Sequence, residues 1–400
     1  MRITNLAPEF IKAMPILQKI EDAGYEAYFV GGSVRDTLLH LPIHDVDIAS
    51  SAYPAEIKAI FSHTIDTGIQ HGTVTVMQGK EGYEITTFRT ESGYQDFRRP
   101  DKVTFVRSLA EDLQRRDFTI NALAMRHNGE IIDLFNGLQD LSNKLIRAVG
   151  DPNERFHEDA LRMMRAVRFE AKLGFRIEAN TQAALANHHQ LLAKIAVERI
   201  HVEFVKMMMG KWRNNGLRSF LDAKLYENCP GFVDHGEDLA AILNLDTTQL
   251  PDEATVWTLV AIACHLNAKQ TRQLLRQWKS SNELIDVVTA AVSLLATWQQ
   301  ETPWDYYQAG LLAINAALNV AKLYQPQLDI QHYLQQYQNL PIHQRSEMAI
   351  SGGDLIKQLG LKPGPQIGKL VNEIEKRIVN GQVANDTDAI LNDVQQNLLN

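Results

Sequence analysis

The spacing of apolar and polar residues changes part-way along the chain. Between residues 25 and 133, short apolar runs alternate with glycine and polar turn residues, which predicts strands mixed with short helices. Strands are predicted at 28–30, before a pair of glycines, and at 44–48, where polar and apolar residues alternate. Two β-rich runs, 73–77 and 83–88, are separated by turn residues and predict an antiparallel hairpin.

After residue 150 the strand signals stop and helical periodicity takes over. Segments 154–172, 181–189 and 197–209 combine apolar residues at helical spacing with good helix formers. A last block, 350–400, has two Gly/Pro turns followed by amphipathic helix. The pattern predicts an α+β head followed by a long all-α remainder.

Composition narrows the class of protein. The 400 residues are 45% hydrophobic and 22% charged, which is typical of globular proteins. Two cysteines, Cys229 and Cys264, are too few for a disulfide framework or a cysteine-rich zinc site, so we expect a cytoplasmic location. The N-terminus lacks the apolar core of a signal peptide, and no apolar run approaches the roughly 18 residues of a membrane-spanning helix.

The overall charge argues against nucleic-acid binding by the surface as a whole. The chain has 48 acidic and 40 basic residues, a formal net charge of -8. Because phosphate contact needs positive surface, RNA binding would depend on local basic patches. One candidate is the last block, where basic residues surround a Gly/Pro turn; solvated lysines on a helical hairpin explain them equally well. These residues are Lys357, Lys362, Lys369, Lys376 and Arg377.

The segment from Gly31 to Asp36 is a candidate phosphate-binding turn. Gly31 and Gly32 follow a predicted strand and let the backbone approach a ligand closely. Arg35, near the start of the next helix, could add a guanidinium for phosphate. An ordinary turn with a solvated arginine is the alternative.

Asp45 and Asp47 are candidate metal ligands. On a strand, side chains two residues apart point to the same face, so both carboxylates would aim at one point while Val46 packs inward. Hard cations such as Mg²⁺ bind such oxygens together with substrate phosphates. A surface strand end with two solvated acids is the alternative for this motif taken alone.

Four motifs that follow one another along the chain are specific when taken together: 31–36, 45–47, 112–122 and 158–169. Together they resemble the signature of class II tRNA nucleotidyltransferases and bacterial poly(A) polymerases, in the type that lacks an HD phosphohydrolase domain. These enzymes belong to the DNA polymerase beta-like nucleotidyltransferase superfamily. The motifs all fall in the first half of the chain, and the second half matches the family only in its helical character.

The resemblance implies a division of the chain into four parts. A nucleotidyltransferase head with a mixed, mostly antiparallel sheet and flanking helices would occupy 1–150, and an all-α neck that reads the nucleotide base would occupy 151–210. An all-α body, 211–325, and an all-α tail, 326–400, would bind tRNA.

The resemblance also implies roles for the motif residues in the head. Asp45 and Asp47 would be the catalytic residues and would hold Mg²⁺ for two-metal phosphoryl transfer. Gly32, Arg35 and Arg116 would bind the nucleotide triphosphate. Glu84, on a neighbouring strand, is a candidate third carboxylate, although a surface acid is the simpler interpretation.

The segment from Asp159 to Arg168 is the candidate base-reading helix. At about 100° per residue, its acid and arginines spiral along one side, and an ordinary amphipathic helix would look the same. Cytosine and adenine both present an amino donor beside a ring acceptor, which a carboxylate and a guanidinium complement. We therefore hypothesise that Asp159 and Arg162 select C and A over U and G, with Arg165 and Arg168 holding phosphate or stacking near the base.

The predicted function is template-independent addition of C, C and A to the 3′ end of tRNA from CTP and ATP. A polar loop within 90–107 resembles the family's flexible loop, which enzymes that add only the two C residues largely lack. The expected partners are the tRNA acceptor arm and the two nucleotides, with no membrane. Tandem addition to unstable tRNAs and a homodimer stay open. A bacterial poly(A) polymerase is the alternative, and the lack of a strongly basic C-terminal extension counts against it.

Overall fold

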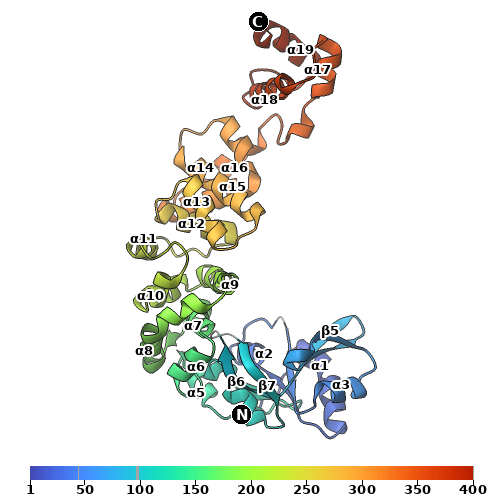
Figure 1. Cartoon of the computed structure of the whole chain (residues 1–400), viewed down its shortest axis with the longest axis vertical. Coiled ribbons are helices and arrows are strands. Elements are labelled where there is room, and N and C mark those ends of the chain that lie inside the picture. The colour runs from blue at the N-terminus through green and yellow to red at the C-terminus, as the bar shows by residue number, and fades with distance from the viewer. Residues whose placement is uncertain (44, 96–98, 400) are drawn as a thin grey trace. The chain divides into compact units, whose positions relative to one another are not determined.

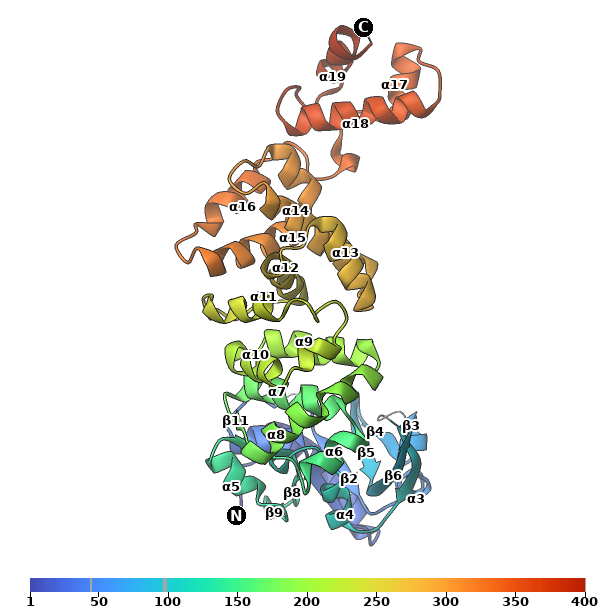
Figure 2. The same cartoon turned by 60° about the vertical axis from the view of Figure 1, so that its left-hand side comes forward.

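A computed structural model of the chain describes residues 1–43, 45–95 and 99–399, with no side chains described for 91–102. The chain divides into two compact units, Met1–Gly236 and Glu237–Asn400. Figure 1 and Figure 2 show their elements. This division is coarser than the four parts expected from the sequence, which stay a prediction.

The first unit contains a seven-stranded sheet in the order β3-β4-β5-β2-β1-β8-β9. Neighbouring strands pair antiparallel except β2 and β5, which pair parallel. A mixed, mostly antiparallel sheet was expected, and the α+β class is confirmed. The strands are β1 (Ala27–Val30), β2 (Asp47–Ser50), β3 (Thr64–Gly68), β4 (Thr73–Gln78), β5 (Glu81–Thr87), β8 (Leu123–Met125) and β9 (Ile131–Asp133).

Strand β2 begins later than the sequence pattern predicted. The prediction was 44–48; residue 44 lies outside the described residues, and β2 starts at Asp47. Asp47 pairs with Val30, the last residue of β1. Because the chain turns away at Gly31, β1 offers no partner to the residues before Asp47. The predicted hairpin, by contrast, is present as β4 and β5.

The segment predicted as a polar loop contains two strands instead. β6 (Arg89–Gln95) and β7 (Arg99–Phe105) pair antiparallel in a sheet of their own, and residues 96–98 of the predicted loop lie outside the described residues. Two strands that pair only with each other need not alternate apolar and polar residues, which is the pattern by which a half-buried strand is recognised.

The core of the head forms where helix α1 packs on strand β1. All four residues of β1 are buried, and the ring of Phe29 meets Phe10 of α1 (Pro8–Asp22) edge to face at 4.8 Å between centroids. The other helices of the head are α2 (Gly32–Leu38), α3 (Pro54–Ile60), α4 (Leu109–Gln114) and α5 (Gly137–Ser142).

The helical part of the first unit differs from the prediction in two places. The helix expected at 154–172 is broken into α6 (Pro152–Glu158) and α7 (Leu161–Leu173). A two-residue strand, β11 (Arg176–Ile177), pairs parallel with β10 (Leu145–Ile146), so strands do not stop at residue 150. α7 packs against α9 and α10 (Figure 2). The remaining helices are α8 (Ala179–His188), α9 (Val197–Met208) and α10 (Arg213–Asp222).

Helices are the only regular elements among the described residues of the second unit. Its largest helix, α15 (Pro303–Tyr324), is kinked at Gly310, where φ is 71°. Buried residues of α15 and α18, including Ile314, Leu318 and Ile374, share one core cluster. The helices are α11 (Gly236–Ala241), α12 (Glu253–Ala263), α13 (Ala268–Gln277), α14 (Asn282–Ala296), α15, α16 (Ile330–Gln338), α17 (Gly352–Leu359), α18 (Pro365–Val379) and α19 (Thr387–Asp393).

None of the helices among the described residues combines the length and the apolar character that crossing a membrane requires.

Candidate active site

The turn after strand β1 requires glycine for two reasons. Gly31 has a φ of 73°, a conformation that residues with a Cβ rarely adopt. A Cβ at this position would also lie 3.2 Å from Nη1 of Arg116 and 3.8 Å from Oδ2 of Asp47. The turn thus brings an arginine and a carboxylate to one point. Gly32, the predicted phosphate residue, follows as the first residue of α2.

Three of the five acidic residues that line one cavity beside this turn are candidate site residues. Asp45, Asp47 and Glu84 line a cavity of about 610 Å³. The parallel pairing of Ile48 with Ile85 places the preceding residues, Asp47 and Glu84, next to each other on neighbouring strands. Desolvation raises the pKa of Asp47, Arg116 opposes the shift, and the charges of Glu84 and Asp45 add to it. The predicted pair is therefore brought together, with Glu84 as a third acid.

The donor set fits a hard divalent cation. Asp45 and Asp47 are accessible to solvent, and among the described residues neither has an ion-pair partner of opposite charge. Burial is the main cause of the raised pKa of Asp47, and repulsion by the nearby charges of Glu84 and Asp45 adds a smaller part. Mg²⁺ prefers oxygen ligands of this kind. The argument from strand alternation holds only for Asp47, because Asp45 precedes the strand.

Arg116 lies at the edge of this site and is held by a buried acid. Its Nη2 lies 3.2 Å from Oδ2 of Asp112, which also pairs with Arg115 at 2.7 Å. Burial would raise the pKa of Asp112, but the two arginines outweigh it and lower that pKa. Since its Nη1 is the group closest to Gly31, Arg116 is the predicted triphosphate residue that the structure places beside Asp47.

Arg35 lies in a buried network instead. Only 3% of Arg35 is exposed, and its Nη2 lies 2.6 Å from Oδ1 of Asp36. Its Nη1 donates to Oδ1 of Asn121 at 2.6 Å, and its guanidinium lies 5.0 Å from the ring centre of Phe169. These contacts tie α2 to the segment after α4 and to α7.

Asp159 lies in the break between α6 and α7, not on a helix. Its backbone is extended, with φ -139° and ψ 101°, so the predicted placement of Asp159 on one continuous helix is wrong. The reason is local: Oδ1 of Asp159 accepts a hydrogen bond from the backbone N of Leu161 at 3.0 Å, which satisfies a free donor of the first turn of α7. Arg199 of α9 approaches the other oxygen, with Nη2 3.1 Å from Oδ2.

Arg162 is held by contacts on both sides of the break. Its Nη1 donates to Oε2 of Glu158 at 2.7 Å and to the carbonyl of Arg155 at 3.3 Å, and its Nη2 donates to the carbonyl of Arg115 at 2.7 Å. These bonds use three of its five N–H donors and leave at most two for a ligand. The structure thus fixes Arg162 near Asp159: its backbone N donates to the carbonyl of Asp159 at 3.0 Å, but the two side chains are not paired with each other.

Arg165 and Arg168 each have an acidic partner and both lie against Phe169. Arg165 Nη2 is 2.6 Å from Oδ2 of Asp117, and Arg168 Nε is 2.5 Å from Oε2 of Glu203. Their guanidinium carbons lie 5.4 and 4.1 Å from the centre of the Phe169 ring. Burial lowers the pKa of Arg168, whereas the charge of Asp117 raises that of Arg165.

Sequence reasoning missed the acids and the arginine that hold these side chains. Glu158 is four residues before Arg162, so an i, i+4 pairing rule could have suggested it. Asp117, Glu203 and Arg199 carry no such signal, because they reach their partners from other elements.

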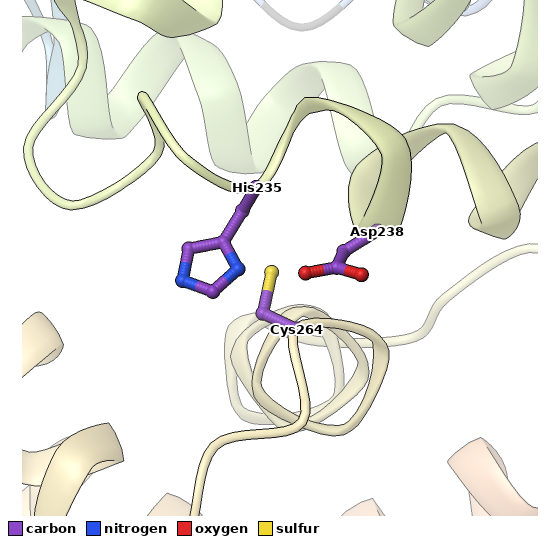
Figure 3. Close-up of side chains that lie close together, drawn as sticks. All are labelled: His235, Asp238 and Cys264. Atoms are coloured by element: carbon purple, nitrogen blue, oxygen red, sulfur yellow. The ribbon is translucent and has the colours of Figure 1, made fainter.

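A separate group of candidate ligands is drawn in Figure 3. In the second unit, the Cys264 thiol lies within 4.8 Å of the Asp238 carboxylate, and His235, from the residues just before this unit, is drawn with them (Figure 3). Burial, with the charge of Asp238, raises the pKa of Cys264 to about 12. Without a cation, the thiolate that would bind a metal is therefore disfavoured at Cys264. We assign no metal to this group.

Three family models match the chain in sequence order. They describe a poly A polymerase head domain at residues 27–147, an RNA and SrmB-binding site of polymerase A at 174–234, and tRNA nucleotidyltransferase domain 2 at 248–394. The head match includes Asp45, Asp47 and Arg116, while Asp159 lies between the first two matches.

Curated relatives match over almost the whole chain. The CCA-adding enzyme of Latilactobacillus sakei is 55% identical over 394 residues, covering 98% of this chain and 99% of the relative. That of Lacticaseibacillus paracasei is 56% identical, covering 98% and 97%. The crystal structure of the Bacillus stearothermophilus CCA-adding enzyme in complex with CTP has a TM-score of 0.88 at 37% identity, with 98% of each chain covered. A Thermotoga maritima CCA-adding enzyme complexed with tRNA shares the fold at a TM-score of 0.64 and 21% identity.

Proposed function

The chain belongs to the CCA-adding enzymes, and on that premise we propose how its residues divide the work of adding C, C and A to the 3′ end of tRNA. The activity rests on the relatives that are 55% and 56% identical over nearly the whole chain. CTP and ATP are the substrates, and pyrophosphate leaves at each step. The roles of individual residues rest on the geometry around Gly31 and around the α6–α7 break.

Asp45 and Asp47 bind the catalytic metal in this proposal. Nucleotidyltransferases of this family use divalent metal ions, and we assign Mg²⁺ here because the ligands are accessible carboxylates. Bound Mg²⁺ supplies positive charge to the triphosphate and lowers the pKa of the attacking hydroxyl. Glu84 lies beside Asp47 and adds negative charge that favours cation binding.

Arg116 binds the triphosphate beside the acids. Its guanidinium faces the Gly31 turn, where no Cβ stands between it and Asp47. Gly32 offers the adjoining backbone to phosphate oxygens. We also propose that Arg35 serves triphosphate binding, as predicted from the sequence. It would do so by fixing the turn that follows β1 through its buried bonds to Asp36 and Asn121.

Asp159 and Arg162 select the base. The Asp159 carboxylate accepts from the amino group of cytosine or adenine, and the free N–H donors of Arg162 reach the ring acceptor. Uracil and guanine would place a carbonyl oxygen against the carboxylate. Arg165 and Arg168, backed by Phe169, add positive charge beside the base and the phosphates.

A primer extension tests the activity. A tRNA transcript lacking its 3′ CCA is incubated with Mg²⁺ and with CTP, ATP, or both. We expect extension by two nucleotides with CTP and by three when ATP is also present. Long adenosine tails from ATP alone would indicate the poly(A) polymerase alternative. No extension in any mixture would overturn the proposal.

The metal and the tandem reaction have their own measurements. Extension should stop when EDTA removes divalent ions and return when Mg²⁺ is added in excess; return only with another cation would refute the choice of Mg²⁺.

A tRNA with a destabilised acceptor stem should receive a second CCA, and a product that ends at one CCA would refute tandem addition.

A further inference from the structure

We propose that Arg199 of α9 is a positioning residue for base selection, because it fixes the Asp159 carboxylate in the break between α6 and α7. This inference rests on the proposed role of Asp159. In this proposal Arg199 does not contact the reacting phosphate. It acts through the direction in which the carboxylate presents its lone pairs.

The backbone alone does not fix Asp159. The residue has extended φ and ψ and lies between two helices. Its backbone N donates to the carbonyl of Arg155 at 3.3 Å and its carbonyl accepts from the backbone N of Arg162 at 3.0 Å, but neither bond involves the carboxylate. Two groups hold the carboxylate: the backbone N of Leu161, 3.0 Å from Oδ1, and Nη2 of Arg199, 3.1 Å from Oδ2. Nη1 of Arg199 also reaches Oδ1 at 3.5 Å. A guanidinium that spans both oxygens defines the plane of the carboxylate.

The Asp159 carboxylate can still accept a hydrogen bond from a nucleotide base. Each carboxylate oxygen accepts about two hydrogen bonds. Oδ2 receives one from Arg199 and keeps the other lone pair for an amino group. The side chains of Arg199 and Asp159 are 30% and 20% exposed, so the pair stays reachable by a nucleotide.

The same face of α9 also contacts Arg168, another residue proposed to act near the base. Glu203 is four residues after Arg199, on the same side of the helix, and it pairs with Arg168 of α7. α9 packs against α7 along this face. One helix therefore contacts the segment at both ends, at Asp159 and at Arg168, and sets the spacing between them.

The test measures discrimination between CTP and UTP in the full-length enzyme. In Arg199→Met we expect kcat/KM for CTP to fall about 10-fold, mostly through a higher KM, with UTP incorporation changed less. The ratio of CTP to UTP efficiency then narrows. Arg199→Lys keeps the charge without the planar fork and should recover part of the ratio. Glu198→Gln, at an exposed neighbour on the same helix, is the matched control and should leave the ratio unchanged.

A double-mutant cycle with Asp159→Asn separates positioning from general destabilisation. If Arg199 acts through Asp159, Arg199→Met adds little to the CTP/UTP ratio of Asp159→Asn. Fully additive effects would overturn the inference, as would an unchanged ratio in folded Arg199→Met. If Arg199→Met does not fold, Arg199→Lys decides by the same two criteria. Failure of the wild type to add C, or an unchanged ratio in Asp159→Asn alone, would instead refute the proposed function.

Discussion

The two halves of the proposed active site differ in whether their acids are ion-paired. In the head, Asp45 and Asp47 are accessible acids that, among the described residues, have no ion-pair partner of opposite charge. In the helical part of the first unit, Asp159 and the three arginines after it each pair with an opposite charge. These pairs are Asp159 with Arg199, Arg162 with Glu158, Arg165 with Asp117 and Arg168 with Glu203.

Under the proposed function, the difference follows from what each half binds. A metal site keeps its negative charge uncompensated, because the cation itself provides the compensation. A site that distinguishes bases by hydrogen bonds needs fixed directions, and an ion pair held in place by packing provides them. Mutations should therefore affect catalysis in the first half and folding or selectivity in the second.

The largest effect is expected at the unpaired acids. Asp47→Ala should lower the rate of C addition on the order of 10³-fold, because metal binding stabilises the transition state by several kcal/mol. The midpoint of thermal unfolding should hardly move, since the side chain is accessible to solvent. The measurement is single-turnover extension beside calorimetry. Glu81→Gln is the matched control in the same cavity, and an equal loss there would contradict the assignment.

Alanine substitution at Asp117 should, by contrast, lower the stability of the fold. Asp117 is 8% exposed and accepts bonds from Arg165, from the backbone of Phe118 and from Asn121. Removing one partner of a buried pair costs about 3–5 kcal/mol of unfolding free energy. Urea denaturation of Asp117→Ala measures this loss. A cost below about 1 kcal/mol would show that the contrast between the two halves does not extend to stability.

A further test of the comparison comes from Glu170, a buried acid of α7. It is buried, its Oε2 has no hydrogen-bond partner among the residues that the structure describes, and burial raises its pKa from 4.5 to about 7. Between these pH values the folded state binds one proton more than the unfolded state, so the free energy of unfolding falls as pH rises through this window and is constant above it. Glu170→Gln should remove a fall on the order of 3 kcal/mol. Denaturation at pH 5 and pH 8 gives the result, and parallel pH dependences would refute it.

The smallest effect is expected at Asp159. Asp159→Asn keeps the shape of the side chain but adds an amide donor, so the ratio of CTP to UTP efficiency should narrow roughly 10- to 100-fold. Thermal stability should change little compared with Asp117→Ala, because Asp159 is partly exposed. Competition between the two nucleotides in one reaction measures the ratio. An unchanged ratio would remove the base-reading role from the paired half.

The sequence predicted the acids of the head better than the contacts around the base. Asp45 and Asp47 are two residues apart, so local reasoning could place them at one site, and the sheet of the head follows from β-rich runs. The break at Asp159 was missed because helical spacing continues through it, and it is seen in the extended backbone of Asp159 and in the cap contact with Leu161. Arg199 could not be foreseen, because it reaches Asp159 across 40 residues of chain by the packing of α9 on α7.

The parallel pairing of β2 with β5 has a consequence for the order of folding. Every other neighbouring pair in the seven-stranded sheet is antiparallel, whereas this one needs the crossover through α3, β3 and β4 before Glu84 can reach Asp47. Contacts between distant parts of a chain form late, because loop closure must precede them. On the ribosome, a nascent head that ends before β5 carries Asp45 and Asp47 without a closed cavity. The growing chain therefore completes the proposed metal site only when the strand containing Glu84 has emerged.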